Sequence, residues 1–398
     1  MICHIYDARN KENIRLISDG KIISSSEINN KTIETWSYDP RLPSEGDLRC
    51  ASLYMPGSSL EDLCPEELKS RWGKNIKKIE AFCQAFKASM VDMNDHCLFD
   101  LIPLKHTLEY FSLKEQITDF VLKKYEKPAN YDFMLGVSKY VKGVKSRSLN
   151  LDLSQLNKSL HETRARVLRK ILEKKVPYIM YKIDGTKTGR LTTEKRSFPI
   201  MTLDKGYRSV VKPNNDVFLE LDYNAAELRV LLALSGVEQP EQDLHDWNSR
   251  VVYHGLQTRE EAKKRIFAWL YNPDSKDHLS SKAYNRSLVL QKHYNNQVVT
   301  TPFGREIEAD RYHALNYLIQ STTSDMVLEQ IGKITEVLEG TDSYIAFSVH
   351  DSVVIDFCKD DKEKISDLAK KFSETRFGKL PFSLKIGGDY GKMREYKI

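Results

Sequence analysis

Two aspartates occupy positions at which a carboxylate could bind a metal ion. Asp222 ends an alternating stretch, residues 217–222, that is typical of a half-buried strand, and leucines at helical spacing follow it as far as Gly236. Asp351 lies between two apolar runs in residues 344–357, a pattern that predicts a hairpin with this carboxylate at its tip. Hard divalent cations such as Mg²⁺ bind carboxylate oxygens. Taken singly, each aspartate is equally consistent with a helix cap or a charged hairpin tip.

A second group of residues has the polarity of a nucleoside triphosphate. Thr258 and Glu261 make a capping-box pattern, so we predict a helix over residues 258–271. Four of its side chains recur every fourth residue, namely Arg259, Lys263, Phe267 and Tyr271. The stripe is cationic where the helix begins, where the partial charge of the helix also favours phosphate, and aromatic about 18 Å further on. The alternative is an ordinary amphipathic helix whose aromatic residues face the core.

Two further stretches could contact nucleic acid. Residues 183–208 are rich in Gly, Thr, Lys and Arg, which can place hydroxyl, amide and guanidinium groups against phosphates. Tyr312, Asn316 and Gln320 are spaced to share one face of a predicted helix, and such side chains could read the minor-groove acceptors common to all base pairs. A solvated loop and a polar surface are the respective alternatives.

The rest of the sequence has the composition of an ordinary globular protein. Its 398 residues allow two or three domains, and residues 58–180 have a mainly helical pattern, with a charged amphipathic helix over 151–175. Lys and Arg number 61 against 56 Asp and Glu, and a net charge of +5 does not by itself indicate a nucleic-acid partner. We find no apolar run of membrane length, no signal-peptide pattern and no CxxC pair among six cysteines. We therefore expect a cytoplasmic protein without a membrane span or zinc site.

In their order and spacing these residues resemble the motifs of the family A DNA polymerases, the bacterial DNA polymerase I type. Residues 222–229 resemble motif A, the 258–271 helix resembles motif B, and residues 349–352 resemble motif C. Residues 188–191 resemble the family's TGRLS segment, and Asn316 with Gln320 resembles its N-x3-Q helix. The resemblance covers roughly residues 150–398.

The sequence departs from the family's pattern at several places. Asn272 and Pro273 follow the motif B tyrosine, where the family has glycine, and Ser352 stands where motif C carries a second acidic residue. The NLQNIP segment, a DNA contact in the family, is replaced by SFPI at residues 197–200. Family members often carry a proofreading exonuclease before the thumb, with an acidic D-x-E signature; in that part of the sequence residues 7–9 (DAR), the nearest candidate, do not match it.

The resemblance implies a template-directed DNA polymerase that adds deoxynucleotides to a primer 3′-hydroxyl by two-metal phosphoryl transfer. Asp222 and Asp351 would hold two Mg²⁺ ions, with Mn²⁺ able to substitute, joined by the backbone carbonyl of Tyr223, and Lys263 would act as general acid. Glu227 would exclude a ribose 2′-hydroxyl. The nucleotide would also contact Arg259, Lys263, His245, Phe267, Tyr271 and Tyr223. Primer-template DNA would contact Thr188, Arg190, Tyr312, Asn316, Gln320 and His350.

The fold implied is an α+β right hand with an antiparallel palm sheet, helical fingers and a helical thumb. The expected segments are a small accessory piece of unknown role (1–57), thumb (58–180), first part of the palm (181–236), fingers (237–295) and second part of the palm (296–398). A compact chain without 3′→5′ exonuclease is phage-like, and it would work in the host cytoplasm. Its partners would be primer-template DNA and dNTPs, together with replisome proteins such as a helicase, a separate exonuclease or a processivity factor.

Two other functions compete with this interpretation. A single-subunit RNA polymerase shares the two aspartates, but Glu227 would occupy the space that a ribonucleotide needs. A catalytically inactive DNA-binding replisome component would have no need to keep Asp222, Asp351, Arg259 and Lys263 together.

Overall fold

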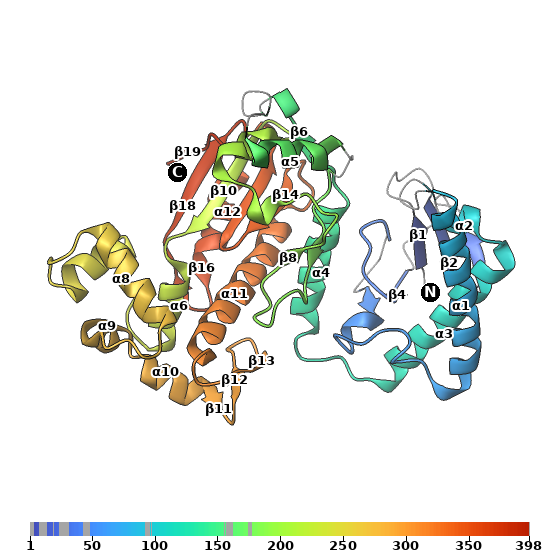
Figure 1. Ribbon diagram of the computed structural model, residues 1–398, viewed down its shortest axis with the longest axis horizontal. Helices are drawn as coiled ribbons and strands as arrows, with labels where there is room; N and C mark the ends of the chain where they lie inside the picture. Colours follow the sequence, from blue (N-terminus) through green and yellow to red (C-terminus); the bar gives the residue numbers. More distant parts are fainter. Residues whose placement is uncertain are drawn as a thin grey trace. The chain divides into compact units, whose positions relative to one another are not determined.

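The structure, a computed structural model, forms two compact units, Met1–Lys142 and Gly143–Ile398 (Figure 1). It describes residues 4–7, 14–18, 20–23, 32–42, 48–91, 96, 98–154, 156, 162–173 and 177–397. Ala8 and Arg9, part of the DAR triplet, and Cys3 and Cys97 lie outside the described residues. The other four cysteines are free thiols. Among the described helices, none combines the length and the apolar character needed to cross a bilayer.

The first unit is built from long helices and short strands. Its elements are β1 (His4–Asp7), β2 (Ile14–Ser18), β3 (Lys21–Ile23), β4 (Glu34–Thr35), β5 (Arg49–Cys50), α1 (Glu66–Ala88), α2 (Leu98–Leu101), α3 (Leu104–Lys124) and the start of α4 (Tyr131–Lys145). One apolar core includes Cys50 and Leu53, which come before residue 57, and Trp72, Leu113 and Ile117 from α1 and α3. The boundary expected at residue 57 is therefore not an edge of this unit, because residues on both sides share a core.

The second unit is organised on a five-stranded antiparallel sheet with strand order β14-β15-β10-β18-β19. Its strands are β14 (Tyr344–Val349), β15 (Ser352–Phe357), β10 (Val217–Tyr223), β18 (Phe382–Gly387) and β19 (Arg394–Glu395). The predicted strand at residues 217–222 is present, but it is not half-buried. Phe218 to Leu221 are all buried, because β10 is the central strand and is covered on both faces.

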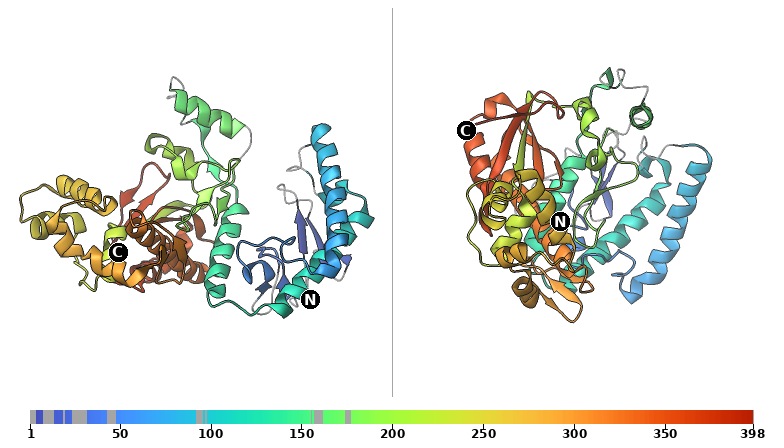
Figure 2. Two further views of the ribbon diagram at one scale, coloured as in Figure 1. Left: turned by 60° about the horizontal axis from the view of Figure 1, so that its bottom comes forward. Right: turned by 60° about the vertical axis from the view of Figure 1, so that its left-hand side comes forward.

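Helices surround this sheet and extend away from it. α11 (Ala314–Leu338) packs against α12 (Lys364–Ser373), α6 (Ala226–Leu234) and β14. α8 (Arg259–Tyr271), α9 (His278–Tyr284) and α10 (Arg286–His293) lie to one side of α6 and α11 (Figures 1 and 2), and α7 (Leu244–Trp247) packs against α8. The mixed helix and sheet composition expected from the sequence is confirmed. The roles of palm, fingers and thumb stay a proposal.

Shorter elements connect these parts. They are β6 (Asn150–Leu151) paired with β9 (Val211–Lys212), α5 (Thr163–Glu173), β7 (Tyr181–Lys182) paired with β8 (Thr192–Thr193), the short helices Ile200–Thr202, Lys205–Val210, Asn248–Val252 and Lys359–Asp361, β11 (Tyr294–Asn295), β12 (Val298–Thr300), β13 (Glu306–Glu308), β16 (Glu374–Thr375) and β17 (Gly378–Lys379). The helix predicted over 151–175 is shorter than expected, because Leu151 belongs to a strand and α5 begins only at Thr163.

Candidate active site

The two predicted metal-binding aspartates lie at the same end of two paired strands, Asp222 on β10 and Asp351 in the turn that precedes β15. Asp222 near the end of β10 is paired in register with Ser352, the first residue of β15, and Asp351 immediately precedes that serine. Asp351 and His350 form the tip of the β14–β15 hairpin, where His350 adopts a left-handed conformation with φ of 56°. A tight antiparallel turn thus brings Asp351 to the end of the strand that carries Asp222.

The negative charges of these carboxylates are only partly compensated by nearby positive charges. Burial, followed by the charges of Asp351 and Glu220, raises the pKa of Asp222 to about 6. Burial also raises the pKa of Asp351. Lys385 of β18 is the nearby cation, with its Nζ 3.4 Å from Glu220 Oε2 and 3.8 Å from Asp222 Oδ2.

Such a site suits a divalent cation, since the cation would offset the burial that raises both pKa values and the weaker repulsion from neighbouring carboxylates. Within the described part of the chain, no group of three or more His, Cys, Asp or Glu side chains is arranged to hold a metal ion. A metal here would accordingly depend on Asp222, Asp351 and a backbone carbonyl such as that of Tyr223, completed by water or substrate oxygens. The Tyr223 side chain is turned to the core, where its ring stacks on Phe372 with centroids 4.0 Å apart.

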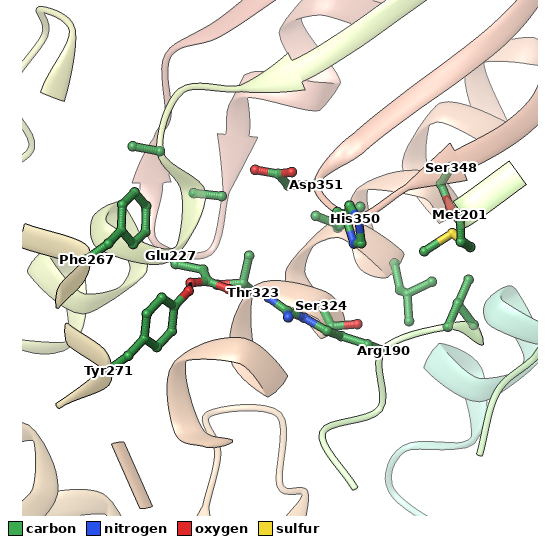
Figure 3. A pocket seen from close by; sticks show the side chains of 15 residues that line it. Arg190, Met201, Glu227, Phe267, Tyr271, Thr323, Ser324, Ser348, His350 and Asp351 are labelled. Atoms are coloured by element: carbon green, nitrogen blue, oxygen red, sulfur yellow. Dashed lines mark hydrogen bonds and ion pairs between the residues drawn. The ribbon is translucent and has the colours of Figure 1, made fainter. Parts of the chain in front are cut away.

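A cavity of about 370 Å³ opens beside Asp351. Six of the residues predicted from the sequence line it, namely Arg190, Glu227, Phe267, Tyr271, His350 and Asp351. Figure 3 shows Phe267 and Tyr271 on one side, Arg190 and His350 on the other, and Glu227 between them. Glu227 accepts hydrogen bonds from the Arg190 guanidinium and from the Tyr271 hydroxyl. The carboxylate therefore links residues 188–190, here called the TGR loop, to the last turn of α8 across the cavity.

The stripe on α8 forms as predicted. Thr258 caps the helix and exchanges hydrogen bonds with Glu261 in a complete capping box. The rings of Phe267 and Tyr271 stack with centroids 5.9 Å apart. Lys263 is exposed and makes no ion pair with any residue that the structure describes. His245, expected to contact phosphate, is buried with 5% exposure beside the Phe267 ring, and burial lowers its pKa.

Arg259 differs from the expectation of a free phosphate-binding cation. Its Nε and Nη2 donate to the two carboxylate oxygens of Asp243 at 3.1 and 2.8 Å, and its Nη1 donates to Glu260 at 2.9 Å. Burial acts to raise the pKa of Asp243, but hydrogen bonds from Arg259, Asn224 and the Asp246 amide outweigh it and hold the pKa well below its usual range. Asp243 is consequently an ionised partner of Arg259 at neutral pH.

The residues predicted to contact DNA are only partly brought together. Arg190 and His350 line the cavity, whereas Thr188, Asn316, Gln320 and Tyr312 do not. Thr188 is buried and Asn316 is partly buried on α11, with its Oδ1 lacking a hydrogen-bond partner among the described residues. Tyr312 is 53% exposed but lies in the turn before α11, so it is not on the helical face that its spacing suggested. The helix starts two residues later, at Ala314.

Several residues that shape the site were not predicted from the sequence. Asp243 and Lys385 are the partners of Arg259 and Asp222. Met201, Thr323 and Ser324 line the cavity. Glu220, whose charge acts on Asp222, was missed as well, although the sequence contained a signal for it. It is two residues before Asp222 and must therefore share its face of the strand. The others come from distant segments, and no local pattern could have identified them.

Known DNA polymerases resemble this chain in sequence and in fold, although no family model matches it. A DNA polymerase of Mycobacterium phage D29 is 27% identical over an alignment of 174 residues, and the match covers 35% of this chain and 28% of that protein. The polymerase domain of Pol1 from M. smegmatis, solved with DNA primer-template and dNTP, matches 95% of this chain and 91% of its own with a TM-score of 0.60 and 12% identity.

The chain has a polymerase-domain fold. Because the identity is only 12%, this structural similarity establishes the fold and nothing more. The chain covers little more than a quarter of the phage polymerase's length. Both comparisons lead to DNA polymerases, as the motifs around Asp222, Tyr271 and Asp351 do. Within this fold, the two aspartates lie at one end of the five-stranded sheet, and the aromatic wall of Phe267 and Tyr271 lies on α8.

Proposed function

We propose that the chain is a template-directed DNA polymerase of family A, which transfers deoxynucleotides to a primer 3′-hydroxyl. The observation that supports the proposal is that Asp351 lines a cavity walled by Phe267, Tyr271 and Glu227, while Asp222 lies near the end of β10, which pairs with the strand that follows Asp351. The Asp351 carboxylate and the aromatic rings of Phe267 and Tyr271 line the same cavity, as a metal-bound triphosphate with a base requires. The motif spacing and the polymerase-domain fold support the same function.

The residues divide the work of binding and positioning. Asp222, Asp351 and the Tyr223 carbonyl would hold two Mg²⁺ ions. When bound, such ions activate the primer hydroxyl and neutralise the leaving pyrophosphate. Lys263, exposed on the first half of α8, would bind the phosphates and supply a proton to the leaving group. His245 could join these contacts only after a local shift, because it is covered by Phe267 in this conformation.

The cavity walls would set the choice of substrate. Phe267 and Tyr271 present stacked rings to the sugar and base, and Glu227 occupies the space beside them. A ribose 2′-hydroxyl would meet that carboxylate, so deoxynucleotides are favoured. Arg190 and His350 line the opposite wall, where the terminal primer-template pair would lie, and Thr188, Tyr312, Asn316 and Gln320 would contact the duplex further away. Such contacts are independent of base sequence.

Primer extension tests this proposal in one experiment. Purified protein, a labelled primer-template and Mg²⁺ are incubated with dNTPs or with NTPs. We expect extension with dNTPs, and its loss by a factor of at least about a thousand in Asp222→Asn or Asp351→Asn, while primer-template affinity changes little. If the wild type extends no primer, the interpretation as an inactive DNA-binding protein is the one that remains. If it uses NTPs as well as dNTPs, an RNA polymerase is favoured.

Two finer parts of the proposal concern the surroundings of the reaction. We expect no 3′→5′ shortening of a mismatched primer by this chain, since residues 1–180 carry no D-x-E signature. Shortening that survives Asp222→Asn would contradict this. Replisome proteins such as a helicase or a processivity factor would be its partners in the cytoplasm of a host cell, and co-purification from such cells would test for them.

A further inference from the structure

Asp243 occupies the centre of a polar cluster that joins motif A to the beginning of α8. Its Oδ1 accepts from the backbone amides of His245 and Asp246 at 2.9 and 3.0 Å, which makes it the N-cap of α7. Its Oδ2 accepts from Asn224 Nδ2 at 2.8 Å. Both oxygens also bind Arg259. Asp243 is thus fixed by the chain on three sides, independently of the arginine.

Asn224 is itself held firmly. Its Oδ1 accepts from the Leu244 amide at 3.1 Å, and its backbone carbonyl accepts from Arg229 Nε at 2.8 Å. Arg229 has no solvent exposure. Asn224 lies two residues after Asp222, so the cluster is anchored to the strand that carries this aspartate. The more exposed member of the pair is Arg259, whose side chain is 41% exposed against 23% for Asp243.

All three nitrogens of the Arg259 guanidinium are engaged in this structure, by Asp243 and by Glu260. Asp243 occupies the edge formed by Nε and Nη2, so a phosphate can bind this edge in the bidentate manner that guanidinium groups favour only if Asp243 is released. Release costs little at Asp243, because its carboxylate keeps two backbone amides and the Asn224 amide as donors. No buried charge is left without partners by the exchange, which is the usual penalty for breaking such a pair.

We propose that Asp243 is a positioning residue that holds Arg259 in the nucleotide-free protein and surrenders it to the triphosphate. The inference rests on the proposed function for the identity of the phosphate ligand. Asp243 then competes with the phosphate for Arg259, and a nucleotide must displace it before the Nε and Nη2 edge of Arg259 can bind phosphate. Lys263, one turn further along α8 and without an ion pair in the described chain, makes the first contact.

The test measures phosphate binding apart from polymerisation. Inorganic tripolyphosphate is titrated calorimetrically into the full chain in EDTA without DNA. Asp243→Asn removes the charge and keeps an oxygen for the N-cap of α7, but it loses the acceptor for Asn224 Nδ2, so its melting temperature should lie slightly below that of the wild type. We expect it to bind tripolyphosphate about two- to fivefold more tightly, the range for loss of a partly exposed competing ion pair. Asp243→Ser, which also caps α7, is the second variant should Asn perturb folding.

Two controls separate exchange from other effects. Asp246→Asn makes the same charge change on the same helix without a hydrogen bond to Arg259, and it should change the affinity less. In an Arg259→Ala background, Asp243→Asn should have no effect. Unchanged or weaker binding by Asp243→Asn, or a gain that survives Arg259→Ala, overturns the proposal.

The same variants give a kinetic readout in primer extension. Asp243→Asn should lower the KM for dNTPs by a similar factor and change kcat less. A raised KM would mean that Asp243 orients Arg259 toward the phosphate rather than competing with it, and this too overturns the proposal. Failure of the wild type to extend primers at all would remove the proposed function, while the tripolyphosphate comparison would still decide the exchange.

Discussion

At the scale of single residues, Asp222 carries a charge that the fold keeps in an unfavourable place. Its pKa is raised to about 6, above the ordinary value of 3.8, by burial and by Asp351 and Glu220. The folded protein therefore binds a proton here more readily than the unfolded chain does. The resulting loss of stability is absent below the unfolded pKa, grows as pH rises, and is complete above the folded pKa.

This predicts that Asp222→Asn stabilises the metal-free protein. In EDTA at pH 8 we expect urea unfolding to give a free energy about 1 kcal/mol higher than in the wild type, a shift of this size being reduced by the partial exposure of the side chain. The difference should vanish below about pH 4. Asp216→Asn, on the same segment, is the control, because a hydrogen bond from the Lys359 amide lowers the pKa of Asp216. That variant should not stabilise the protein.

Glu227 combines two roles that substitutions can separate. It fills space in the cavity, and it links Arg190 to Tyr271 through its carboxylate. If bulk excludes ribonucleotides, Glu227→Ala should raise the kcat/KM for NTPs relative to dNTPs by about tenfold or more, whereas Glu227→Gln, of nearly equal size, should keep most of the discrimination. Equal relaxation in both variants would assign selectivity to the charge, and none in either would remove Glu227 as the gate.

At the scale of elements, the TGR loop is fastened to α11 through Gly189. Ser324 Oγ of α11 donates to the Gly189 carbonyl at 3.3 Å. Arg305 makes a two-point ion pair with Asp325, which is only 1% exposed, and its guanidinium lies directly against Gly189. A Cβ at Gly189 would lie 2.5 Å from Arg305 Cζ, and the φ of +71° already disfavours a side chain.

Gly189→Ala should therefore be more harmful than the same change at a glycine with free space. Gly236 has a φ of +73° and no atom within 4 Å of the place that a methyl group would take, so Gly236→Ala should lose only about 1 kcal/mol for backbone strain. Gly189→Ala should lose about 2–4 kcal/mol in urea unfolding, through the strain and the disturbed ion pair. It should also weaken primer-template binding, because Arg190 is the next residue. Equal losses at the two glycines would show that Arg305 moves aside freely.

At the scale of the whole molecule, the chain has two compact units, and the first has an apolar core of its own. Ile117 of α3 has no exposure and packs in that core. Ile117→Ala should cost about 2–5 kcal/mol, by loss of burial and formation of a cavity. We expect amide hydrogen exchange to become faster in α1 and α3 and to stay nearly unchanged in β10 and β15. Uniform acceleration in both sets of elements would indicate one cooperative unit instead.

The sequence by itself determined the local features of this protein. The strand that ends near Asp222, the helix that follows it, the capping box at Thr258 and the hairpin tip at Asp351 are all where the patterns place them. The stripe from Arg259 to Tyr271 follows from helix geometry alone. Each of these depends on hydrogen bonds and side-chain periodicity within a short segment, and a short segment is what a pattern describes.

Only the tertiary structure decided which distant groups meet. The sheet places Asp351 beside Asp222 and adds Lys385 from a third strand. The packing of α8 forms the ion pair of Arg259 with Asp243 and the hydrogen bond from Tyr271 to Glu227. The burial of β10 on both faces was also decided by the tertiary structure, because the alternation of apolar and polar residues along β10 does not show that it is the central strand. Charge, pKa and accessibility depend on neighbours supplied by other segments, so the state of each site residue is a property of the folded chain.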